Sequence, residues 1–276
     1  MLRSMMVLAL AAGTTALSAQ DRTTRNDDFG RSSDAWCADA SRWNRNDHSS
    51  CNVREESLGG ATSLDIDTGG NGSIKVRGIA GATPHVRLRI VAHARSDADA
   101  QSLANDIDVS TAGGRIRARG PRTSGGEGWS VDVEVESPRD MPLTLTTQNG
   151  GVSIEHVSAR TRFDTTNGGV SLSDVAGDVR GRTVNGGLVV SLDGQRWDGA
   201  GLDVETTNGG VRMTLPQGYN AELTAETTNG GLSIDFPVTV QGQLSGLNRR
   251  ISTTLGSGGP RLHVRTVNGG VSIAKR

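Results

Sequence analysis

The stretch Thr165-Thr166-Asn167-Gly168-Gly169-Val170-Ser171-Leu172 decides the fold of this chain. The tripeptide Asn-Gly-Gly occurs at six places; its first three copies are 18 residues apart and later ones 23, 21 and 39 apart. Thr stands two residues before the Asn in every copy. Self-similarity with a period near ~20 residues is typical of a solenoid. The repeated turn residues are Thr147, Asn149, Thr165, Asn167, Thr183, Asn185, Thr206, Asn208, Thr227, Asn229, Thr266 and Asn268.

Aliphatic residues stand three and five positions after each Asn, and the position between them is mostly polar. Such alternation on both sides of a turn predicts two strands per repeat, each with one buried face. The residues that we expect to point inward are Val152, Ile154, Val170, Leu172, Leu188, Val190, Val211, Met213, Leu232, Ile234, Val271 and Ile273.

The pattern predicts an all-β, single-domain, right-handed parallel β-solenoid (β-helix) of about ten coils of 18–23 residues over residues 57–276. Equivalent Asn and Thr side chains would then stack and hydrogen-bond from coil to coil. The alternative is an antiparallel meander or barrel in which Asn-Gly closes hairpins. That alternative gives no reason for the invariant Thr.

The turn chemistry leads to two expectations about single residues. Gly186 should adopt a positive φ, which would make Gly186→Val severely destabilising. Thr183→Val should be mild if the hydroxyl only lines the corner.

Upstream, the repeat degrades without vanishing. Residues 63–76 and 108–116 keep a strand-turn-strand form, and residues 86–94 alternate as a strand. Ser96, with Asp99 three positions later, predicts an N-cap and one short helix near 96–106. Degenerate units at one end are typical of caps on a repeat array.

The N-terminus has the pattern of a signal peptide over residues 1–19. Arg3 supplies positive charge, residues 5–12 form a short apolar run, and small residues around Ala19 offer a cleavage site. That run is too short to span a bilayer, and no later segment is apolar enough. We therefore expect export to the periplasm, the cell surface or the medium, with no transmembrane span in the mature chain.

Residues 20–56 have the composition of a polar leader and contain both cysteines, Cys37 and Cys51. In an exported chain such a pair predicts a disulfide. The alternatives are free thiols or a metal site in which His48 and Asp47 join the cysteines, although this spacing is not that of a zinc site. Trp36 and Trp43 are candidates to pack on the domain that follows.

Composition excludes some functions. The chain has 29 Lys and Arg against 30 Asp and Glu, a net charge of −1, which argues against a nucleic-acid partner. The five His residues share no metal spacing, and no phosphate loop, dinucleotide fingerprint or nucleophile elbow is present. We expect no cofactor.

The succession of residues 133–139 (Val-Glu-Val-Glu-Ser-Pro-Arg) and 143–154 (Leu-Thr-Leu-Thr-Thr-Gln-Asn-Gly-Gly-Val-Ser-Ile) resembles the bacterial putative-adhesin family. The resemblance covers roughly residues 57–276 and implies an exported or membrane-tethered β-repeat domain of unknown function in the cell envelope. The family has no agreed catalytic residues to transfer. This chain departs from it in its Cys-bearing leader and in the longer unit around Trp197.

One outward row could carry chemistry. It lies three residues before each Asn and includes Arg182, Glu205 and Glu226. If the two glutamates lie on stacked neighbours, they could form a carboxylate pair for glycoside hydrolysis, with Arg182 as an electrostatic helper. The alternative is a salt-bridged solvent face, which the mixture of signs in the row and the lack of an aromatic sugar platform favour.

The sequence therefore predicts a non-enzymatic, exported, adhesin-like protein that presents an extended surface to an envelope protein or glycan. A carbohydrate-active enzyme, a polysaccharide hydrolase or lyase on a β-helix, is the competing class. Ice binding by outward Thr rows is disfavoured because charged residues interrupt the row.

Overall fold

A computed structural model describes residues 31–38, 40, 48–236 and 249–276. The chain divides into two units, residues 1–31 and 32–276, and the description below concerns the second. The expected signal peptide, Trp43 and Asp47 lie outside the described residues.

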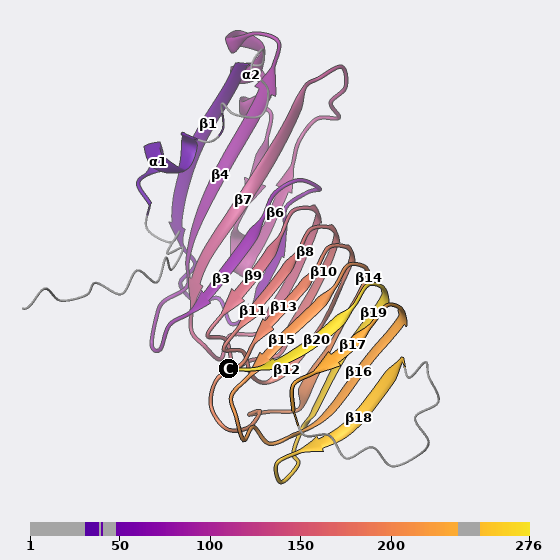
Figure 1. Ribbon diagram of the computed structural model, residues 1–276. Helices are drawn as coiled ribbons and strands as arrows, with labels where there is room; N and C mark the ends of the chain where they lie inside the picture. Colours follow the sequence, from indigo (N-terminus) through magenta and orange to yellow (C-terminus); the bar gives the residue numbers. More distant parts are fainter. Residues whose placement is uncertain (1–30, 39, 41–47, 237–248) are drawn as a thin grey trace, which may run out of the picture. The chain divides into compact units, whose positions relative to one another are not determined.

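The described strands form two ten-stranded sheets, called A and B here (Figure 1). In spatial order, sheet A consists of β1 (His48–Ser57), β4 (His85–Ala94), β7 (Gly128–Ser137), β3 (Ile74–Gly78), β9 (Val152–Glu155), β11 (Val170–Ser173), β13 (Leu188–Ser191), β15 (Val211–Leu215), β20 (Val271–Lys275) and β17 (Leu232–Ile234). Sheet B consists of β18 (Arg250–Leu255), β16 (Ala221–Asn229), β19 (Arg261–Asn268), β14 (Gly201–Asn208), β12 (Asp178–Asn185), β10 (Thr161–Asn167), β8 (Leu143–Asn149), β2 (Leu64–Asp67), β6 (Arg115–Arg119) and β5 (Asp108–Ser110).

The central strands are parallel and in register with the repeat. Asn167 on β10 lies opposite Asn149 on one side and Asn185 on the other. The two strands that flank Asn167-Gly168, β10 and β11, belong to different sheets and therefore do not form a hairpin. Parallel stacking is thus confirmed for these strands, and the antiparallel alternative is excluded there.

The number of stacked units differs from the expected ten. The described strands contain eight parallel strand-turn-strand units: β6/β7, β2/β3, β8/β9, β10/β11, β12/β13, β14/β15, β19/β20 and β16/β17. The remaining strands, β1, β4, β5 and β18, pair antiparallel at the ends of the sheets. Antiparallel strands form hydrogen bonds with backbone N–H and C=O groups that a terminal unit would otherwise leave unpaired. The segments in which the repeat is degenerate therefore act as caps at the ends of the array.

The units are not stacked in sequence order. At one end, β19/β20 lie between β14/β15 and β16/β17, so the last unit of the chain separates its two predecessors. In Figure 1 these yellow strands lie among orange ones. At the other end, β2/β3 lie between β6/β7 and β8/β9. Each terminal region of the repeat array is therefore held on both sides by other units.

The core lies between the two sheets, where alternate residues of each strand are buried. Of the twelve residues expected to point inward, ten are at most 2% exposed. Leu232 and Ile234 are only partly buried because β17 is the edge strand of sheet A. In sheet B, Phe163 fills the space in front of Gly181, since any Cβ at that glycine would lie under 3.0 Å from the ring.

The predicted helix is present as α2 (Asp97–Asn105), and Ser96 caps it by accepting a hydrogen bond from the backbone N–H of Asp99 at 3.1 Å. A short helix, α1 (Ser33–Cys37), and a 3₁₀ turn, η2 (Ala112–Gly114), were not expected. Residues 48–56, which we assigned to the leader, belong to β1, and this strand pairs with β4 over ten residues.

Candidate functional site

An unbroken ladder of Asn side chains follows the turns. Each Nδ2 donates to the Oδ1 of the next Asn at 2.7–2.9 Å, through Asn229, Asn268, Asn208, Asn185, Asn167, Asn149 and Asn71 in that order. The ladder ends where Asn71 donates to the carbonyl oxygen of Trp129 at 3.1 Å. The predicted stacking of the Asn residues is confirmed. Asn71 was missed because Thr68 stands three positions before it, whereas Thr stands two positions before the Asn in the six copies.

The repeated Thr residues are buried and use their hydroxyls differently from the expected Thr–Thr stacking. Each Thr donates to the carbonyl oxygen of the first Gly of the neighbouring Asn-Gly-Gly, as Thr183 does to Gly168 at 2.8 Å. The other pairs, at 2.7–3.0 Å, are Thr165–Gly150, Thr206–Gly186, Thr266–Gly209 and Thr227–Gly269, while Thr147 donates to Gly72. The motif therefore supplies both partners of a buried hydrogen bond between units.

The first Gly of each turn is required for a reason other than the one we predicted. The φ of Gly186 lies outside the left-handed region. Instead, a Cβ at Gly186 would lie under 3.0 Å from the carbonyl oxygen of Gly168, a separation that real Cβ atoms essentially never show. Close backbone approach, and not positive φ, selects glycine here.

Two rows of side chains cross the outward face of sheet B, and the order of the units sets their charge pattern. The row three residues before the Asn runs, in space, through Asp164, Arg182, Glu205, Arg265 and Glu226, and Arg250 on β18 extends it. Its signs alternate strictly. Ion pairs join Arg182 to Asp164 at 2.9 Å, Arg250 to Glu226 at 3.3 Å and Arg265 to Glu205 at 4.0 Å. The row is a salt-bridged face.

Glu205 and Glu226 therefore do not lie on adjacent strands, contrary to the arrangement that we considered for a carboxylate pair. Arg265 lies opposite both of them, because β19 separates β14 from β16. Glu226 also lies 3.4 Å from Nε2 of His263. Arg182, the expected helper, is paired with Asp164.

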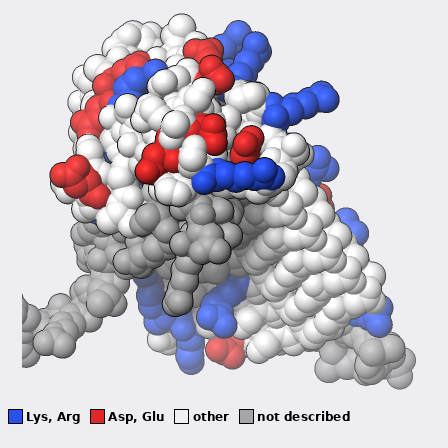
Figure 2. All heavy atoms as spheres, turned by 90° about the horizontal axis from the view of Figure 1, so that it is seen from above, with Lys and Arg blue, Asp and Glu red and all other residues white. Residues whose placement is uncertain are grey.

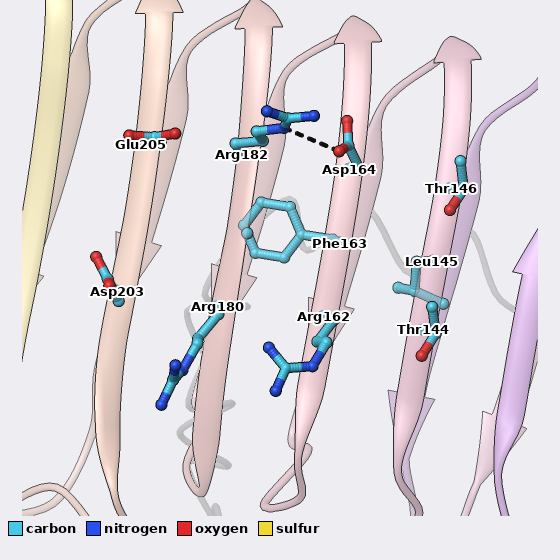
Figure 3. Close-up of a pocket in the computed structure, with 11 residues that line it drawn as sticks. Thr144, Leu145, Thr146, Arg162, Phe163, Asp164, Arg180, Arg182, Asp203 and Glu205 are labelled. Atoms are coloured by element: carbon cyan, nitrogen blue, oxygen red, sulfur yellow. Dashed lines mark hydrogen bonds and ion pairs between the residues drawn. The ribbon is translucent and has the colours of Figure 1, made fainter.

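A shallow pocket of about 420 Å³ lies on this face over β8, β10, β12 and β14 (Figure 3). The second row, five residues before the Asn, contributes Thr144, Arg162, Arg180 and Asp203 to it. Figure 3 shows Arg162 and Arg180 side by side on adjacent strands, below the Arg182–Asp164 pair. We had not singled out Arg162 and Arg180, although reading this second row in the repeat alignment would have found them.

The predicted disulfide between Cys37 and Cys51 is present and joins α1 to β1. His48 contacts Asp97 at 2.7 Å rather than the cysteines. Within the described ranges, no group of three or more His, Cys, Asp or Glu residues could hold a metal ion.

Trp36 packs on the domain, as expected. It is 3% exposed, the guanidinium groups of Arg87 and Arg89 lie 4.9 and 5.5 Å from its ring centroid, and its carbonyl oxygen accepts a hydrogen bond from Arg89. In turn, Arg89 pairs with Asp132 at 2.6 Å. The disulfide therefore holds α1 over a charged cluster on sheet A.

On the face shown in Figure 2, Lys and Arg side chains lie along the border of a broad uncharged area. The turn segments from Thr to the second Gly contain no charged residue in any of the six copies. Charged contacts to a partner therefore have to come from the outward strand faces rather than from these turns.

These features define a β-repeat protein of two mainly parallel sheets, joined by polar turn ladders. Residues 105–274 match the family model described as Toastrack DUF4097. The chain belongs to this family, which confirms the resemblance drawn from its repeats. The match begins after β2 and β3, although both strands stack in register with the later repeats. No curated protein matches the chain.

Among solved structures, the chain is similar to a putative cell adhesion protein from Clostridium sporogenes, at 12% identity over 83% of this chain and 100% of the other, with a TM-score of 0.46. It is also similar to a putative adhesin from Bacteroides fragilis, at 10% identity over 82% and 97% of the two chains, with a TM-score of 0.34. A putative lipid binding protein from Parabacteroides distasonis matches at 7% identity over 82% and 96%, with a TM-score of 0.27.

Proposed function

We propose that this protein is an exported, non-enzymatic, adhesin-like component of the cell envelope, a β-solenoid with coils of 18–23 residues that presents an extended surface to a protein or glycan partner. One observation carries the proposal. The outward face of sheet B holds two continuous rows of polar and charged side chains in register across its strands. A partner that binds across the units would meet the same spacing at each step.

The turn ladders support this role because they fix the register. A slip by one residue would break the Asn–Asn bond and the Thr–Gly bond at that turn, and it would move the outward side chains to the core face. The rows are therefore held in place without any contribution from a ligand. Preorganisation of this kind lowers the entropic cost of binding.

Export is supported by the disulfide between Cys37 and Cys51, since such bonds persist mainly in oxidising compartments. In the part of the chain that the structure describes, no helix has the length and apolar character needed to cross a membrane.

A non-enzymatic role is supported by the position of the two glutamates that the competing hydrolase would use. Each lies opposite Arg265, and Glu226 is within 3.3 Å of Arg250. A carboxylate engaged by neighbouring arginines is less free to approach a glycosidic bond, as the acid or nucleophile of a hydrolase must.

The proposal is tested by binding of the purified mature protein to whole cells and to envelope extract of the source organism. Saturable binding, with no turnover on a panel of bacterial and plant polysaccharides, is the expected result. Turnover that Glu205→Gln abolishes would overturn the non-enzymatic role. Absence of saturable binding to either preparation would overturn the adhesin-like role.

A further inference from the structure

The charged residues of both sheets follow one rule, with one exception. Where two of the described Asp, Glu, Lys or Arg residues lie directly opposite each other on neighbouring strands, their signs are opposite, as in Arg87–Glu134, Arg180–Asp203 and Arg265–Glu226. Arg162 and Arg180 are the exception, since they lie opposite each other on β10 and β12. Like charges in this position destabilise a sheet. A cost that is avoided at every other such pair indicates a role at this one.

In addition, no acidic side chain among the described residues forms an ion pair with Arg162. Arg180 forms an ion pair with Asp178 at 2.9 Å. Arg162 is exposed and has no ion-pair or hydrogen-bond partner for its side chain within the described part of the chain. Its guanidinium fork is thus available to a ligand, and Figure 3 shows it reaching from β10 towards β12.

The surface around Arg162 is hollowed on both sides. The pocket of about 420 Å³ over β8, β10, β12 and β14 adjoins a second one of about 360 Å³, and the two share Thr144 and Arg162. The second pocket adds Arg115 and Arg160, both exposed and, among the described residues, without a side-chain partner. We call this run of two pockets the arginine groove. It crosses the strands, so a linear ligand would lie along the stack.

We propose that the arginine groove binds the carboxylate or sulfate groups of an acidic glycan. This inference rests on the proposed binding role of the protein and names the partner class. A guanidinium fork matches the two oxygens of a carboxylate or sulfate, and an anion between Arg162 and Arg180 would turn their repulsion into attraction. The exposed hydroxyls of Thr144 and Thr146 add donors beside it.

The composition of the groove favours a glycan over an acidic protein. Stable protein interfaces rely on exposed aromatic or aliphatic anchors that enter pockets. The large apolar residues at the larger pocket are Leu145 and Phe163, and they are 0% and 4% exposed. The groove is instead open and polar. Its two pockets are lined by five arginines, by threonine hydroxyls and by the carboxylates of Asp65, Asp164, Asp203 and Glu205, a surface that fits a polar, charged chain. The protein as a whole carries a net charge of −1, so general attraction of polyanions is not expected.

The experiment measures binding of the purified mature protein to polygalacturonate and to dextran sulfate, with neutral dextran as reference, by calorimetry at physiological ionic strength. Arg162→Gln and Arg180→Gln are the test variants. Arg212→Gln is the matched control, because Arg212 is exposed on the opposite sheet and lies opposite Val189 and Ser272. Melting curves are recorded for each variant.

We expect one or both polyanions to bind, the two test variants to weaken binding about tenfold, and Arg212→Gln to leave it unchanged. Arg162→Gln should melt no lower than the wild type because it removes the like-charge contact. Equal weakening by Arg212→Gln, a lower melting point for Arg162→Gln, or no binding of either polyanion would each overturn the glycan site. Saturable binding to cells or envelope extract in that case would leave the proposed function standing.

Discussion

The carbonyl oxygen of Gly168 occupies the space that a side chain on Gly186 would need, and the same oxygen accepts the hydroxyl hydrogen bond of Thr183 at 2.8 Å. One backbone atom therefore selects two residues of the next unit, a glycine by exclusion and a threonine by hydrogen bonding. The contact repeats from turn to turn, which explains why the motif is nearly invariant along the chain.

Gly186→Ala should lower the free energy of unfolding by at least about 2 kcal/mol, because the added methyl group collides with backbone that cannot yield without displacing the neighbouring unit. Gly187→Ala is the matched control. There the new Cβ would lie 3.5 Å from the carbonyl oxygen of Gly210, an ordinary contact, so the change should stay within about 0.5 kcal/mol. Urea unfolding followed by circular dichroism measures both. Similar losses would show that the close approach does not constrain the turn.

Thr183→Val should not be mild, because the condition for a mild effect, a hydroxyl that only lines the corner, is not met. Thr183 is 1% exposed, and its loss would leave the Gly168 carbonyl without this donor, at a cost of about 1–3 kcal/mol. Thr183→Ser keeps the hydroxyl and should cost about 1 kcal/mol from the lost methyl group. If serine is as damaging as valine in thermal melts, packing rather than the hydrogen bond is what matters.

Position in the Asn ladder should set the cost of losing an Asn. Asn185 donates to Asn167 and accepts from Asn208, both at 2.8 Å, so Asn185→Ala removes two bonds. Asn229 stands at the start of the ladder and donates to Asn268 at 2.9 Å, so Asn229→Ala removes one. At about 0.5–1 kcal/mol for each exposed bond, the interior variant should lose roughly twice as much stability. Equal losses in urea unfolding would contradict a ladder that acts bond by bond.

Arg265→Glu should destabilise the fold by about 1 kcal/mol, since it places three carboxylates in a row on β14, β19 and β16. The loss should shrink in about 1 M salt, where charges are screened over ~3 Å. Arg212→Glu on sheet A, which has no acid opposite, is the control and should change stability by less than about 0.5 kcal/mol. A loss that is independent of salt would rule out the electrostatic explanation.

Tyr219 allows a test of burial by titration, because it is the single Tyr of the chain. Burial, aided by the charge of Asp174, raises the pKa of Tyr219 from 10.0 to about 12. The folded state therefore holds the phenol proton more tightly than the unfolded state does. Its contribution to stability is complete below pH 10 and is lost as the pH rises towards about 12. Tyrosinate absorbance should appear near pH 12 in the native protein and near pH 10.0 in denaturant. Coincident titrations would contradict the burial.

The local form of each unit is determined by the sequence alone. Alternation around Asn167-Gly168 specifies two strands and their inward faces. The turn motif favours parallel stacking, because Asn167 and Thr165 bond to the equivalent turn of the neighbouring unit. The disulfide between Cys37 and Cys51 and the helix capped by Ser96 follow from equally local signals. Of the candidate site, the sequence indicates which residues face outward.

The order of the units is decided only by the tertiary structure. The six units that contain Asn-Gly-Gly carry the same stacking interface, so the motif by itself is compatible with any order of these units. Contacts between residues that are distant in sequence favour one order over the others, and the charges on sheet B are an example. With β19 between β14 and β16, Arg265 separates Glu205 from Glu226, which sequence order would place opposite each other. By contrast, β10 and β12 stack in sequence order, so the repeat alignment already places Arg162 opposite Arg180, and the tertiary structure decides only which acidic residues reach them.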